Sequence, residues 1–75
     1  MIKYAWFPEI RSDGEGGHYH TYGIAAFESG RSRYISDVTT DKYKIKALVY
    51  TFNNERLELS QLDEAIEDFL YDFEV

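Results

Sequence analysis

The stretch HYHTYGIAAFE, residues 18–28, followed by SGRSRYISDV, residues 29–38, decides the fold of this chain. Both parts are rich in β-branched and aromatic residues, which favour extended strands, and residues 28–31 between them have the composition of a turn. The pattern predicts a β-hairpin whose strands are residues 18–28 and 33–38. Gly23, inside the first strand, indicates a β-bulge or a place where a helix or an aromatic ring packs against the backbone.

The N-terminal segment predicts another strand. Ile2, Tyr4 and Trp6 recur at every second position, which is typical of a strand with one better-buried face. Pro8 has no N–H for a ladder, so we expect this strand to end near Pro8. Residues 11–17 combine three glycines with charged residues and are expected to form a flexible loop.

Two amphipathic helices are predicted after the strands. The first begins at Thr39 or Thr40, whose hydroxyl is a natural N-cap, and ends at residues 53–54. Its apolar stripe consists of Ile45, Leu48, Val49 and Phe52. The second begins at Ser60, in a variant of the capping box. Its apolar stripe consists of Leu62, Ala65, Ile66, Phe69, Leu70 and Phe73. The order β-β-β-α-α predicts an α+β fold, a three-stranded antiparallel meander with both helices packed on one face, and is compatible with an open second face.

Length and composition restrict the class of protein. A chain of 75 residues forms one small α+β domain, residues 1–75. The absence of cysteine excludes disulfides, thiol catalysis and cysteine-based zinc modules. No stretch approaches the roughly 20 apolar residues of a membrane span, and the first residues do not have the pattern of a signal peptide. We therefore expect a soluble cytoplasmic protein with no membrane partner.

The acidity of the chain is concentrated in its last segment. The net charge is −6, and residues 58–75 contain seven acids and no lysine or arginine. Phosphate backbones would repel a chain with this balance, which argues against direct binding of nucleic acid.

Three short motifs carry a resemblance to a known group of proteins. They are YGI at residues 22–24, SDVTTDK at residues 36–42 and IEDFL at residues 66–70. In this order they resemble an uncharacterised family of short Firmicute bacterial proteins, which show a YGI strand, an SD-[IV]-[ST]-TDK helix start and a terminal EDFL helix. The resemblance covers about residues 21–70. It implies a small intracellular domain, and because the family has no established activity it transfers no catalytic residue.

Two histidines are weak candidates for metal ligation. His18 and His20 lie two positions apart on a predicted strand, so their side chains leave the same face, and Asp13 or Glu15 could supply a third ligand. A half-exposed strand histidine is the more ordinary interpretation. The chain has no cysteine nucleophile, no serine in a GxSxG context, and neither a GxGxxG nor a P-loop motif. We therefore predict neither an enzyme nor a cofactor.

The acidic face of the last helix is the main candidate for a binding surface. Tyr71 projects from the middle of this face at helical neighbour spacing from four acids, namely Glu64, Glu67, Asp68 and Glu74. A tyrosine ringed by charges that steer a basic partner is a typical hot-spot arrangement. The alternative is an ordinary solvated face that keeps a small protein soluble.

Tyr43, Ala47 and Tyr50 form a second apolar stripe, on the first helix and opposite its core stripe. We favour a stripe covered by the N-terminal strand or a loop; otherwise it contacts a foreign protein or a second copy of the chain. These features predict a non-enzymatic protein-binding module, a regulator or inhibitor. Two alternatives stay open. One is a nucleic-acid mimic of the phage-inhibitor type, which blocks a DNA- or RNA-binding protein; the other is a weak metal-binding protein using His18 and His20.

Overall fold

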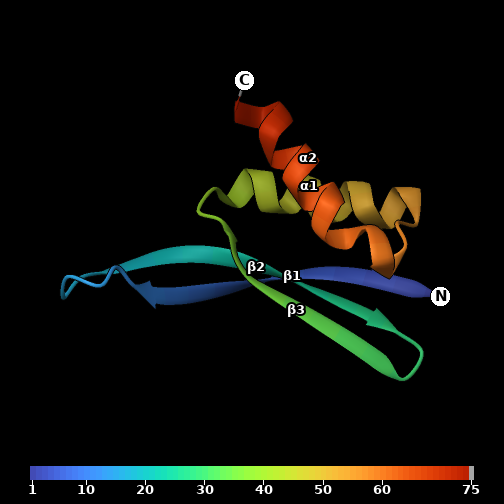
Figure 1. The fold of residues 1–75 in the computed structure, drawn as a ribbon, viewed down its shortest axis with the longest axis horizontal. Helices are drawn as coiled ribbons and strands as arrows, with labels where there is room; N and C mark the ends of the chain where they lie inside the picture. The colour runs from blue at the N-terminus through green and yellow to red at the C-terminus, as the bar shows by residue number, and fades with distance from the viewer. Residues whose placement is uncertain (75) are drawn as a thin grey trace.

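The computed structural model describes the backbone of residues 1–74 and the side chains of residues 1–70. The elements follow the order β1 (Ile2–Ser12), β2 (His18–Glu28), β3 (Arg31–Thr39), α1 (Lys42–Glu55), the 3₁₀ turn η1 (Leu59–Gln61) and α2 (Leu62–Glu74). The strands form one antiparallel sheet in the order β1-β2-β3, and both helices lie over the same face of it (Figure 1). The α+β meander with two helices is confirmed, and β3 is longer at both ends than the predicted residues 33–38.

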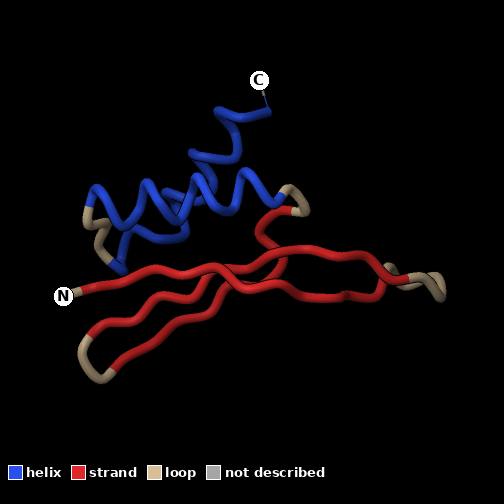
Figure 2. Tube along the Cα trace, turned by 180° about the vertical axis from the view of Figure 1, so that it is seen from behind, coloured by secondary structure: helices blue, strands red, loops and turns tan. Residues whose placement is uncertain are grey.

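β2 has the predicted bounds, but β1 does not. β1 continues through Pro8 to Ser12, so the prediction of an end near Pro8 is wrong. Pro8 is opposite Tyr22 on an edge strand, where a residue without an N–H is tolerated because one side of the strand has no neighbour. The loop therefore shrinks from the predicted residues 11–17 to residues 13–17. The β1–β2 hairpin is long, and its tip extends beyond the helices (Figure 2).

Gly23 lies at an interruption of the ladder between β2 and β3. The register shifts between Tyr22 and Ile24, which marks a β-bulge. A Cβ at Gly23 would lie 2.5 Å from the Phe7 ring and 2.6 Å from the carbonyl oxygen of Ile35. Both reasons given for this glycine, a bulge and a closely packed ring, are confirmed.

The core lies between the sheet and the two helices. Its buried side chains are Tyr4, Ile24, Ala26, Ile45, Leu48, Val49, Phe52, Leu62 and Ile66. This set includes the whole predicted stripe of α1 and the first part of the stripe of α2, whose Ala65, Phe69 and Leu70 are partly buried against it. Phe73 is outside the described side chains. The rings of Tyr4 and Phe52 meet edge to face with centroids 5.5 Å apart, which joins β1 to α1.

Asn53 ties α1 to the free edge of β1. Its side-chain oxygen accepts a hydrogen bond from the N–H of Tyr4 at 2.8 Å, and its side-chain nitrogen donates to the carbonyl oxygen of Tyr4 at 3.0 Å. The Tyr4 hydroxyl also donates to the carbonyl oxygen of Leu57 at 2.7 Å. The amide thus takes the place of a neighbouring strand at one point of an otherwise open edge.

The N-cap of α1 is Asp41, so the predicted caps Thr39 and Thr40 are wrong. The Asp41 carboxylate accepts from the N–H groups of Tyr43 and Lys44 at 2.8 and 3.2 Å. Asp41 has the extended backbone that a cap needs, and its negative charge complements the helix N-terminus. Thr39 instead accepts a hydrogen bond from the N–H of Asp41 at 3.2 Å.

The predicted start of the last helix at Ser60 is also wrong. Ser60 lies inside η1, whose N-cap position is Glu58 without a side-chain cap. Leu59 is partly buried against the core, so the chain begins to coil before Ser60 is reached. A residue inside a helical turn lacks the extended backbone of an N-cap, which prevents the predicted capping box. Within residues 1–74, neither helix is long and apolar enough to cross a membrane.

Candidate functional site

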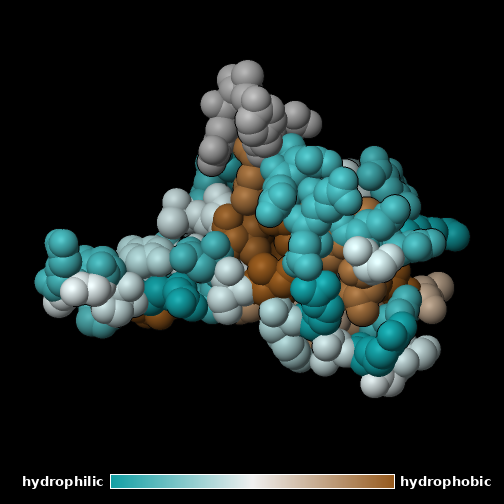
Figure 3. Space-filling model, viewed as in Figure 1, coloured by the Kyte–Doolittle hydropathy of each residue, from teal (hydrophilic) through white to brown (hydrophobic). Residues whose placement is uncertain are grey.

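The described acids of α2 are exposed. Glu64, Glu67 and Asp68 are exposed on α2, and within the described side chains none of them forms an ion pair. Asp63 differs, because it pairs with Arg33 of β3 at 3.1 Å. In the view of Figure 3, hydrophilic residues cover the outer side of α2, and hydrophobic atoms are visible where the helices meet the sheet. Three of the predicted binding residues therefore share one solvent-facing surface.

Tyr71 and Glu74 complete the predicted surface, and their side chains lie outside the described residues. The backbone of α2 continues through both positions, as the prediction requires. A depression of about 260 Å³ lies beside this surface and is lined by Leu57, Gln61, Glu64, Ala65 and Asp68. Small-molecule sites are usually larger, about 300 to 1,000 Å³. The depression is thus smaller than a usual small-molecule site.

The second apolar stripe is open to solvent. Tyr43 is 83% exposed and Tyr50 is 72% exposed, while Ala47 is half-buried. The favoured prediction that β1 or a loop covers the stripe is wrong within the described part of the chain. β1 pairs with β2 and lies beneath the core face of α1, and the connections on either side of α1 are too short to fold back over it. Both tyrosines are thus available to another chain.

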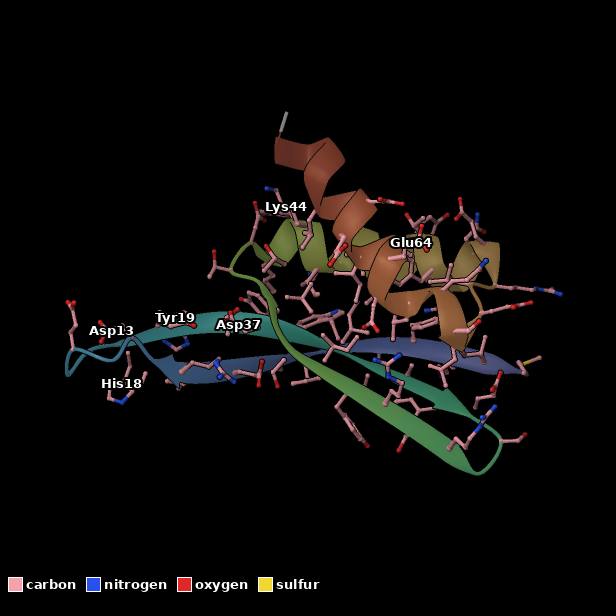
Figure 4. The ribbon with its side chains drawn as sticks, viewed as in Figure 1. Asp13, His18, Tyr19, Asp37, Lys44 and Glu64 are labelled. Carbon is pink, nitrogen blue, oxygen red and sulfur yellow. The ribbon has the colours of Figure 1, made fainter. Side chains whose placement is uncertain are left out.

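The two histidines lie on the uncovered end of the β1–β2 hairpin. His18 and His20 are both exposed, and Figure 4 shows His18 at this end, away from the helices. The Asp13 carboxylate accepts from the N–H groups of Glu15 at 2.7 Å and Gly17 at 3.0 Å, so it closes its own loop. Among the described residues, no group of three or more histidines and acids could hold a metal ion.

Sequence analysis missed an aromatic cluster on the open face of the sheet. The cluster consists of Phe7, Phe27 and Tyr34, one residue from each strand. The centroid of Tyr34 lies 6.4 Å from that of Phe7 and 6.1 Å from that of Phe27, both edge to face. Tyr34 is 64% exposed and Phe27 is 42% exposed. Small residues, Ala5 and Ala25, occupy the same row as Tyr34. The sequence did contain a signal for this cluster, because all three aromatics occupy strand positions that alternate with the core-facing ones.

A polar network also lies on this face, at the bulge. Asp37 has a φ of 54°, and its carboxylate accepts from the hydroxyls of Tyr19 and Thr21, each at 2.8 Å. Its N–H donates to the Glu9 carboxylate at 2.8 Å. Arg11 lies 4.0 Å from both carboxylates. Figure 4 shows Tyr19 and Asp37 together between the hairpin and the end of β3. We call these five residues the polar network.

Hydrogen bonds shift the pKa values of two members of this network, Asp37 and Tyr19. The hydroxyls of Thr21 and Tyr19 stabilise the ionised Asp37 and lower the pKa of its carboxyl group, and Arg11 adds to this effect. The same bond to Asp37 is the largest cause that raises the pKa of the Tyr19 phenol. At neutral pH, Asp37 is therefore an anion and Tyr19 is neutral. No sequence motif predicts the network, because its members come from three different strands.

Three surfaces thus stand out on the described residues: the acids of α2, the tyrosines of α1 and the open sheet face. The acidic surface was predicted from the sequence, the α1 tyrosines were expected to be covered, and the open sheet face was expected without its aromatic cluster and polar network. Comparison with family models, with curated proteins and with solved structures finds no match to this chain.

Proposed function

We propose that this protein is a non-enzymatic protein-binding module, a regulator or inhibitor, that binds a basic partner through the outer side of its helical layer. The observation that carries the proposal is the exposure of Glu64, Glu67 and Asp68 on α2, where none of them forms an ion pair with a side chain among residues 1–70. Tyr71 and Glu74 belong to the proposed surface on the strength of their helical spacing. The proposal includes a cytoplasmic location.

The acids would act mainly on the rate of encounter. A group of like charges attracts an oppositely charged surface from a distance and raises the association rate, and this effect weakens as salt screens the field. Exposed charges alone add little affinity. The proposal therefore needs aromatic anchors, which Tyr43 and Tyr50 of α1 supply together with Tyr71.

The two helices differ in charge, which constrains the partner. Near Tyr43, α1 carries the exposed Lys42 and Lys46, whereas α2 is acidic. The Lys46 ammonium lies 5.9 Å from the centre of the Trp6 ring, which helps to hold it over β1. A complementary partner presents its basic patch to α2 and a neutral or acidic patch to the tyrosines of α1.

The geometry favours this module over a nucleic-acid mimic. At 1.5 Å per residue, the four steps from Glu64 to Asp68 span about 6 Å of helix axis. Duplex DNA carries about one charge per 1.7 Å over many turns, so three free carboxylates imitate only a short piece of it. As the salt concentration rises, a mimic would lose affinity steeply. A tyrosine-anchored interface would lose mainly association rate.

The experiment is to isolate the partner by pull-down and then to measure its affinity for three variants. Glu67→Lys/Asp68→Lys reverses the charge of the surface, Tyr71→Ala removes the proposed anchor, and Glu15→Lys is a charge-reversal control in the hairpin loop. We expect at least a tenfold loss for the first two and little change for the control, with far-ultraviolet circular dichroism showing that each variant is folded. Unchanged affinity for both surface variants would refute the proposal.

A further inference from the structure

We propose that the open face of the sheet is a self-association surface on which a second copy of this chain packs face to face, antiparallel, around the aromatic cluster. This surface is on the opposite side of the sheet from the helices, so it is distinct from the surface of the proposed function.

The aromatic cluster gives this face the composition of an interface centre. Tyr34 and Phe27 are large rings with 64% and 42% of their surface in water, and Phe7 lies against the glycine at the bulge. The edge-to-face contacts among the three rings hold them in place before any partner arrives, which reduces the entropy lost on binding.

The charges at the two ends of the face favour a second copy as the occupant. One end carries Lys3, which is opposite Phe27 on β2. The other end carries Glu9, Asp37 and Arg11 of the polar network, two acids and one base, with Arg11 4.0 Å from both carboxylates, so this end has a smaller net negative charge than its acids alone would give. The face is therefore positive at one end, aromatic in the middle and acidic at the other end.

Such a pattern is complementary to itself in one orientation only. If the two-fold axis runs between the sheets and across the strands, the Lys3 end of each copy meets the Glu9 and Asp37 end of the other. If the axis runs along the strands, Lys3 faces Lys3 and the acids face acids, which is repulsive. The antiparallel arrangement forms two symmetric charge contacts with the aromatic clusters stacked between them.

The size of the face predicts a modest affinity. With 3.4 Å per residue, the three-stranded part of the face, from Lys3 to Pro8 along β1, is about 17 Å long and about 14 Å wide, and the two-stranded part from Pro8 to Arg11 adds about 10 Å of length at about 10 Å of width. The projected area is about 340 Å² per copy, or about 680 Å² for a dimer, and the accessible area is larger because side chains stand out from the plane. A stable specific interface needs about 1,000 Å², so a face of this size is expected to form only a weak, transient dimer.

The test is sedimentation velocity of the intact chain from about 10 µM to about 1 mM, the range expected for an interface of this size. We expect a concentration-dependent shift from monomer to dimer. Tyr34→Ser should raise the dissociation constant at least about 30-fold, since Tyr34 is at the centre of the cluster. Tyr50→Ser is the matched control, because it removes an equally exposed tyrosine from α1 and should leave dimerisation unchanged.

A second pair of variants tests the orientation. Lys3→Glu places an acid opposite the acidic end of the other copy and should weaken the dimer at least about fivefold. Lys42→Glu makes the same change of charge on α1 and should have no such effect. Equal effects of the two lysine variants would overturn the antiparallel arrangement.

Other outcomes would overturn the whole inference. They are a monomer at every concentration, a dimer lost in Tyr50→Ser but kept in Tyr34→Ser, and a monomer whose binding to a foreign protein is lost in Tyr34→Ser. Circular dichroism of each variant separates loss of association from loss of fold. Because Tyr34→Ser leaves the helical layer intact, binding of a partner there should persist, so failure of either proposal can be recognised separately.

Discussion

Asn53 offers the sharpest test of how α1 is held on the sheet. Replacing it with alanine removes both hydrogen bonds to the main chain of Tyr4, at 2.8 and 3.0 Å. The neighbouring Asn54 is also exposed on α1 and makes no such bond within the described residues. Asn54→Ala is therefore a matched control, identical in chemistry and one position along the same helix.

The expected magnitude follows from two opposing contributions. Each lost hydrogen bond lowers the free energy of unfolding by about 1 kcal/mol, so the two together lower it by about 2 kcal/mol. Alanine is a better helix former than asparagine by about 0.6 kcal/mol, which both variants gain. We expect Asn53→Ala to be less stable than Asn54→Ala by about 2 kcal/mol, which corresponds to about 8–16 °C in Tm for a domain of this size.

The assay is thermal unfolding followed by far-ultraviolet circular dichroism, with urea unfolding to obtain the free energy. Measuring both variants at the same concentration removes any contribution from association. If the two variants unfold within about 0.5 kcal/mol of each other, the amide of Asn53 does not hold β1, and the assignment of that contact is wrong.

Three further predictions concern the bulge, the cap and the polar network. Gly23→Ala should lower the free energy of unfolding by at least about 2 kcal/mol in urea unfolding, because its Cβ would meet the Phe7 ring and a backbone oxygen; a variant as stable as the original protein contradicts this. In the same assay, Asp41→Ala should lower the free energy of unfolding by about 1 kcal/mol, whereas Thr40→Ala should lower it little. A larger loss for Thr40→Ala would indicate that the threonine is the cap after all. The lowered pKa of Asp37 means that its contribution to stability is present above its ordinary pKa of 3.8 and is lost as the pH falls through the folded pKa. The Tm difference between the original protein and Asp37→Asn should therefore narrow between about pH 6 and about pH 2.5, and a constant difference would show that the charge of Asp37 has no part in it.

The elements with a clear local period could be predicted from the sequence. The bounds of β2 and the core stripe of α1 follow from alternation and from helical spacing, which depend only on residues near one another. The ends of elements were less predictable, because neighbouring residues compete for the same task. Asp41 and Thr39 are both good caps, and the choice between them depends on where β3 releases the chain.

The surfaces depend on long-range pairing and were harder to predict. The exposure of acids on α2 follows from its amphipathic spacing. The aromatic cluster follows only in part, because the alternation separates Phe7 from Trp6, whereas the meeting of Phe7, Phe27 and Tyr34 depends on the pairing of all three strands. The polar network requires the register between β1 and β2 and the bulge in β3, since Glu9 and Asp37 are 28 residues apart in sequence.

The long β1–β2 hairpin has a practical consequence. Its tip, residues 13–17, lies beyond the helices and is held by a carboxylate of its own loop. Exposed loop tips of small and polar residues tolerate inserted sequence better than other parts of a domain. A fluorescent reporter or an affinity tag spliced into this tip would therefore leave the remaining chain free to be studied in living cells.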